Sequence, residues 1–109
     1  MFSVLRVSML LTLIVASFGT TAFAAEFEVS QKDKQFSIST LKIKVGDTIK
    51  FKNEDPFPHN IYSLSEIQTF DLGSHGQGAV KSVVFQKPGI VEVECAIHPS
   101  MKLTVEVSK

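Results

Sequence analysis

The chain has 109 residues, of which 44% are hydrophobic and 20% are charged, and its formal net charge at neutral pH is zero. This length accommodates one small domain and is too short for two. No surplus of Lys and Arg is available to neutralise phosphates, so nucleic acid is a poor candidate partner.

The first expected element is a signal peptide over residues 1–24. Arg6 precedes an apolar run over residues 7–18, and Ala22-Phe23-Ala24 supplies the small-x-small pattern of a cleavage site. An uncleaved anchor is the alternative, but the apolar run is shorter than the roughly 20 residues that a spanning helix needs. We therefore expect cleavage after Ala24, or one residue later.

Cleavage would leave residues 25–109 as one exported domain. We expect this domain to be a periplasmic monomer that has no contact with the membrane once the signal peptide is removed. It holds ten Lys and eleven acidic residues, and Cys95 is its only cysteine. An unpaired thiol is hazardous in an oxidising compartment unless it is buried or bound to a metal.

Alternation of apolar and polar residues predicts β-strands throughout this domain. The strands are expected at residues 41–45, 49–52, 61–64, 90–95 and 103–107, with turns at 45–47, 53–58, 73–78 and 88–89. No amphipathic helix of useful length is present in the sequence. The pattern therefore predicts an all-β sandwich.

The strand before Cys95 determines where its thiol points. Val91, Val93 and Cys95 share one face, whereas Glu92 and Glu94 share the other, because successive side chains alternate across a strand. The thiol is therefore expected to face inward at the end of the strand.

A tight loop should follow this strand. Pro99 lacks an N–H group and restricts His98 to extended conformations, so pairing is expected to resume only near Lys102. The loop would place His98 and Met101 close enough to Cys95 for the three side chains to converge.

Thiolate, imidazole and thioether groups form a soft ligand set that favours copper over cations that prefer oxygen. A second imidazole would complete the trigonal arrangement of one Cys and two His with a weak axial Met, which is typical of electron-transfer copper sites. His59 is the best candidate, because it lies in a loop and strand start, residues 53–60, that can occupy the same end of the sandwich.

These segments together resemble the cupredoxins, the small blue-copper proteins of the plastocyanin, amicyanin and pseudoazurin type. Residues 41–53 (LKIKVGDTIKFKN) are similar to the family's strand, Gly-Asp turn and strand; residues 58–60 (PHN) resemble its first ligand motif; and residues 95–101 (CAIHPSM) match its short Cys-x2-His-x2-Met loop. The resemblance implies a Greek-key β-sandwich that binds one copper ion near one end. It also implies equatorial ligands His59, Cys95 and His98, and an axial ligand Met101.

The function implied by the resemblance is that of a non-enzymatic carrier, which cycles copper between Cu(II) and Cu(I) and passes single electrons between redox partner proteins. Transient docking is expected through the apolar rim of His98, formed by Phe57, Ile97 and the prolines at 56, 58 and 99. A copper carrier, chaperone or storage protein is the alternative, but it would usually have clustered Met or His residues, and Met101 is the only Met beyond residue 24. A thiol enzyme would need an orienting group and a substrate cleft that the sequence does not indicate.

Three further residues have expected roles. His75 lies in a glycine-rich stretch and is expected to be solvated, since loop histidines usually are. By resemblance, the side chain of Asn60 should tie the two ligand loops together, and its backbone N–H should donate to the thiolate. Ile97 stands where short-loop cupredoxins commonly have proline, so its N–H could be a second donor to the sulfur.

Overall fold

The computed structural model describes residues 23–109, which form nine β-strands. The predicted signal peptide, apart from its last two residues, lies outside the described part. The strands are β1 (Glu26–Lys32), β2 (Gln35–Phe36), β3 (Thr40–Lys44), β4 (Thr48–Asn53), β5 (His59–Ser63), β6 (Phe70–His75), β7 (Val80–Val84), β8 (Gly89–Glu94) and β9 (Lys102–Ser108). Within this range no helix is long and apolar enough to cross a membrane.

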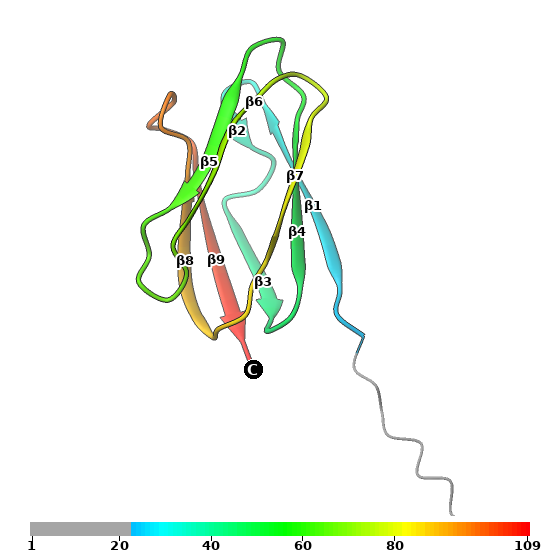
Figure 1. The fold of residues 1–109 in the computed structure, drawn as a ribbon, viewed down its shortest axis with the longest axis vertical. Helices are drawn as coiled ribbons and strands as arrows, with labels where there is room; N and C mark the ends of the chain where they lie inside the picture. The colour runs from blue at the N-terminus through cyan, green and yellow to red at the C-terminus, as the bar shows by residue number, and fades with distance from the viewer. Residues whose placement is uncertain (1–22) are drawn as a thin grey trace, which may run out of the picture.

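The strands form two sheets that pack face to face (Figure 1). One sheet has the order β2-β1-β4-β7 and the other has the order β3-β9-β8-β5-β6. The chain crosses between the sheets several times, and the pairs β1–β4 and β3–β9 are parallel while the others are antiparallel. This non-sequential order confirms the predicted all-β, Greek-key sandwich.

The core lies between the two sheets and follows the alternation of the sequence. In β4, Ile49 and Phe51 are fully buried, whereas the alternating residues Lys50 and Lys52 are partly exposed. The same alternation buries Val91 and Val93 of β8. Burial of one apolar face from each sheet supplies most of the stabilisation of such a sandwich.

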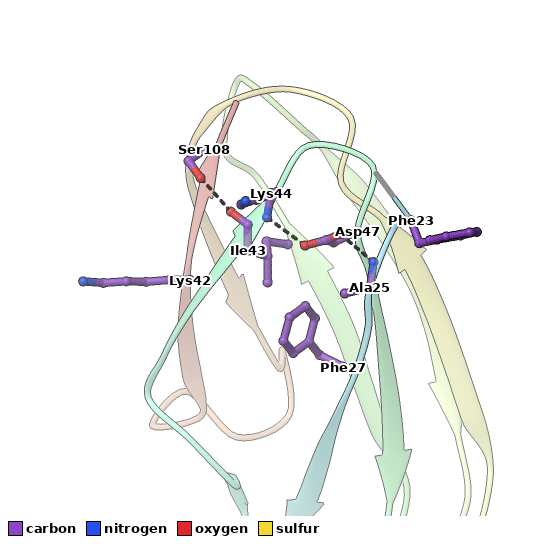
Figure 2. A pocket seen from close by; sticks show the side chains of 8 residues that line it. All are labelled: Phe23, Ala25, Phe27, Lys42, Ile43, Lys44, Asp47 and Ser108. Carbon is purple, nitrogen blue, oxygen red and sulfur yellow. Dashed lines mark hydrogen bonds between the residues drawn. The ribbon is translucent and has the colours of Figure 1, made fainter. Parts of the chain in front are cut away.

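The two ends of the sandwich are built differently. The loop before β5 and the loop between β8 and β9 lie at one end, and the C-terminus lies at the other (Figure 1). At the C-terminal end the buried carboxylate of Asp47 accepts hydrogen bonds from the backbone N–H groups of Ala25 and Lys44, both at 2.8 Å (Figure 2). The shallow pocket drawn there includes Phe23, which precedes the predicted cleavage point.

Strand β6 is where the sequence interpretation was wrong. Residues 73–78 were predicted to be a turn, but β6 continues to His75 and the turn occupies the residues that follow. Gly73 has a φ of 73°, a backbone conformation that glycine adopts without steric cost, and it lies where the pairing of β5 with β6 changes register. A glycine inside a strand at an irregularity of this kind is easily mistaken for a turn signal.

Candidate metal centre

His59 is the first residue of β5, and its side chain is fully buried. Its Nε2 atom lies 2.6 Å from Oδ2 of Asp55, four residues earlier in the loop. An ionised carboxylate only accepts hydrogen bonds, so Nε2 of His59 carries the proton. The other ring nitrogen, Nδ1, is then the atom available as a ligand in the neutral imidazole.

Asp55 is almost completely buried, yet it is well supplied with donors. Its Oδ1 accepts the N–H of Asp33 at 2.8 Å, and its Oδ2 accepts the N–H of Lys34 at 3.1 Å. Burial by itself would raise the pKa of Asp55, but the hydrogen bonds from His59 and from these two N–H groups outweigh burial and hold this pKa below its usual range. The carboxylate is therefore ionised at neutral pH.

Cys95 directly follows β8, and its side chain is only 1% exposed. It points inward together with Val91 and Val93, as the alternation of the strand predicted. Its Sγ atom lies 3.8 Å from Nδ1 of His59 and 3.9 Å from Nδ1 of His98.

His98 lies in the loop between β8 and β9, where a turn closed by the hydrogen bond from the N–H of Met101 to the carbonyl of His98 (2.9 Å) orders the chain. Partial burial lowers the pKa of His98, and the neighbouring His59 and Lys34 lower it further. The imidazole of His98 is therefore neutral at neutral pH, which is the form that binds a metal.

The three donor atoms converge on one point. Nδ1 of His59 and Nδ1 of His98 are 3.1 Å apart, and Sγ of Cys95 lies at nearly equal distances from both, 3.8 and 3.9 Å, so the three atoms form a nearly isosceles triangle. The point equidistant from the three atoms lies about 2.1 Å from each, which matches metal bonds to His nitrogen (about 2.0–2.1 Å) and is about 0.2 Å shorter than a metal bond to Cys sulfur (about 2.3 Å). One thiolate and two imidazoles in a trigonal array are the donor set that suits copper.

Met101 is buried (1% exposed) immediately before β9 begins. Its backbone is fixed by the turn that includes His98. A thioether at this place in the chain is consistent with a weak axial ligand.

The two ligand loops are tied together by Asn60. Its Oδ1 accepts the backbone N–H of Ala96 at 2.7 Å, a link between β5 and the loop that follows Cys95. This contact confirms the predicted role of the Asn60 side chain. The backbone donors from Asn60 and Ile97 to the thiolate stay predictions.

An aromatic ring and an exposed apolar side chain are neighbours of His98. The ring of Phe57 lies 5.6 Å from that of His98 and 5.3 Å from that of His59, measured between centroids. Ile97, the residue before His98 in the chain, is 53% exposed. The ammonium of Lys34 lies 5.9 Å from the centre of the Phe57 ring. His98 is the only one of the four predicted ligands that is not fully buried.

His75 is not solvated, which corrects the sequence interpretation. It is 5% exposed and pairs with His59 across β5 and β6. Its Nε2 donates to Oε1 of Gln31 at 2.7 Å, and its carbonyl accepts from the side chain of Asn53 at 3.1 Å. No local signal marked His75 as buried, because residues 71–75 (DLGSH) do not alternate between apolar and polar side chains, and only the pairing of β6 with β5 brings His75 into the interior.

Comparison with known proteins finds copper-binding relatives, in agreement with the donor set described above. Residues 23–108 match the family described as copper-binding proteins, plastocyanin/azurin family. The methylamine utilization protein MauL of Methylorubrum extorquens is 34% identical over 109 residues, which cover 99% of this chain and 94% of that protein. Amicyanin of Paracoccus denitrificans is 29% identical over 83 residues, which cover 67% of this chain and 58% of amicyanin. The structure of an amicyanin mutant with Cu(I) shares the fold, with a TM-score of 0.71 and 22% identity over 76% of this chain and 82% of that chain.

Proposed function

This chain belongs to the plastocyanin/azurin family of copper-binding proteins, and we propose that it is a periplasmic type 1 copper protein that carries single electrons between redox partners. The observation that carries the proposal is the triangle of Nδ1 of His59, Sγ of Cys95 and Nδ1 of His98. We assign these three side chains as equatorial ligands and Met101 as the axial ligand. The bound copper supplies a reversible one-electron change between Cu(II) and Cu(I).

The protein supplies a fixed arrangement of donors. His59 is fully buried on β5, held through Nε2 by Asp55, and Cys95 follows the central strand β8. Ligands that are fixed by the scaffold need not rearrange when the metal changes oxidation state, which keeps the reorganisation that accompanies electron transfer small.

The exposed edge of His98 is the proposed route for the electron. Phe57 and Ile97 are apolar neighbours of His98, and a small apolar surface suits brief docking because its removal from water is favourable without the cost of desolvating charged groups. The relative MauL is named for methylamine utilization, so a methylamine-oxidising system is the first class of donor to test.

Adding copper to the purified exported protein tests the proposal. An intense blue colour that disappears on reduction, with one copper per chain, is the expected result. A colourless site, or one that a mild chelator empties readily, would favour a copper carrier or storage protein. Turnover of a thiol-dependent reaction without metal would favour an enzyme instead.

A further inference from the structure

The loop between β4 and β5, residues 54–58, contains a carboxylate that the ligand set does not include. Asp55 is 3% exposed, and its two oxygens accept three hydrogen bonds: from Nε2 of His59 and from the N–H groups of Asp33 and Lys34. Asp55 is itself held in place by a fourth bond, from its own N–H to Oδ1 of Asn53 at 2.8 Å. The carboxylate therefore cannot turn away from His59 without breaking several contacts.

The backbone N–H groups that hold Asp55 come from an unusual turn. Asp33 and Lys34 connect β1 to β2, and both have positive φ angles, of 54° and 58°. Two successive residues with positive φ form the tight hairpin turn that matches the twist of the strands, and here both of their N–H groups point at one carboxylate. The turn thus fixes both oxygens of Asp55, including Oδ2, which also accepts the hydrogen bond from His59.

We propose that Asp55 is a positioning residue that lowers the reduction potential of the copper site through His59. This inference rests on the proposed function. A carboxylate that accepts the Nε2 proton fixes the tautomer and the ring orientation of His59, and it makes Nδ1 a stronger electron donor. The more highly charged Cu(II) gains more from a stronger donor than Cu(I) does. No proton moves: the electron arrives from a redox partner, and Nε2 of His59 keeps its hydrogen in both oxidation states.

Asp55→Asn tests this inference, because it keeps the size of the side chain and removes the charge. Loss of a partner of this kind typically weakens metal binding 10- to 100-fold, and we expect the weakening to fall mainly on Cu(II). Each tenfold loss of Cu(II) affinity relative to Cu(I) raises the potential by about 59 mV for one electron. The readouts are the potential of the blue protein by voltammetry and the Cu(II) affinity by competition with a chelator.

Asp47→Asn is the matched control. Asp47 is also buried and also accepts hydrogen bonds from two backbone N–H groups. It directly precedes β4, however, at the opposite end of that strand from the ligands. We expect this variant to unfold at a lower temperature and to keep the wild-type potential. If Asp55→Asn behaves in the same way, with a potential equal to or below that of the wild type, the inference is wrong.

A measurement on the unchanged protein covers the case in which Asp55→Asn does not fold. In the diamagnetic Cu(I) protein, nitrogen NMR of His59 should show a protonated Nε2 with a slowly exchanging hydrogen. An unprotonated Nε2, or a hydrogen on Nδ1, would overturn the inference. A wild-type protein that binds copper without a blue colour would instead contradict the proposed function, so the two failures are distinguishable.

Discussion

His59 and His75 are directly paired across β5 and β6, and both imidazoles are buried. His75 donates to Gln31, and the side-chain amide of Asn53, at the end of β4, donates to the carbonyl of His75. A buried polar layer thus lies next to the proposed ligand His59, and it joins strands of both sheets. Hydrogen bonds connect this layer across the two sheets, but Nε2 of Gln31 and Nδ1 of His75 have no partner among the described residues, so the layer includes buried polar atoms that are costly to desolvate.

This layer makes the stability of the protein sensitive to mild acid. Burial lowers the pKa of His75 below its ordinary value of about 6.5. As the pH falls below that value, the unfolded chain takes up a proton at this position before the folded chain does, so the free energy of unfolding decreases. The loss continues until the pH reaches the lowered pKa of the folded state.

His75→Gln should reduce this dependence, since glutamine is polar and does not titrate. The measurement is denaturant unfolding of the wild type and the variant at pH 7.5 and pH 5.5, both loaded with copper. Titration of the ligand side chains changes the free energy of unfolding equally in the two proteins. The difference between their losses of stability is therefore due to His75. An identical loss of stability in both proteins would contradict the prediction.

Cys95→Ser should abolish the blue absorption while the sandwich stays folded. The hydroxyl is a hard, weakly donating group that cannot replace the thiolate in the copper site. Because Cys95 is 1% exposed, burying a hydroxyl there should cost about 1–3 kcal/mol of unfolding free energy. Visible absorption after addition of copper and far-ultraviolet circular dichroism check the two parts; persistence of the blue band would exclude Cys95 as the ligand.

The sequence predicted the sandwich and the donor cluster because both depend on local rules. Strand alternation placed Cys95 inward, and Pro99 interrupted the pairing before β9. His59 was found from its motif and confirmed by its position next to Cys95 and His98.

The carboxylate and the second buried histidine could not be predicted in this way. Asp55 looks like an ordinary turn residue, and only the meeting of the β1–β2 turn with the loop before β5 shows that it is buried against His59. His75 required the register of β5 with β6, which a glycine within the strand obscured. Contacts between residues far apart in the chain depend on tertiary pairing rather than on local pattern.

Asn60→Ala should loosen the loop that follows Cys95. Removing Oδ1 leaves the N–H of Ala96 without its 2.7 Å partner, and a hydrogen bond of this kind contributes about 1 kcal/mol to stability. We expect a lower unfolding temperature and faster loss of copper to a chelator. Asn60→Asp keeps an accepting oxygen and should restore most of both properties; failure of that rescue would show that the Ala96 contact is not the cause.

Ile97→Glu should slow electron exchange without altering the blue spectrum, since it charges the rim of His98 but leaves the ligands in place. Self-exchange between oxidised and reduced copies needs no partner protein and can be measured by NMR line broadening. Two like charges brought within about 4 Å in water cost roughly 1 kcal/mol, which corresponds to about a fivefold slower rate at low salt. Added salt should recover part of the loss.

Ile90→Glu is the matched control for this prediction. Ile90 and Ile97 are both 53% exposed, but Ile90 lies near the start of β8, at the other end of the strand from Cys95. The new charge at Ile90 should leave the exchange rate unchanged. Equal slowing in both variants would mean that the rim of His98 is not the docking surface.

Ile97→Pro should lower the reduction potential, and the reason is a single backbone hydrogen. Proline lacks the N–H that we predict to donate to the thiolate of Cys95. A donor to the sulfur withdraws electron density and stabilises Cu(I) more than Cu(II), so its loss should favour Cu(II). If about 1 kcal/mol of such a bond differs between the oxidation states, the potential falls by roughly 40 mV. Ile97 is half exposed, so the substitution removes little packing, and proline there requires a φ near −65° at residue 97 and an extended Ala96. Voltammetry of a variant with an intact blue spectrum gives the answer: an unchanged or higher potential would mean that the N–H of Ile97 points away from the sulfur, and that the tuning of the site comes from His59 and its partners instead.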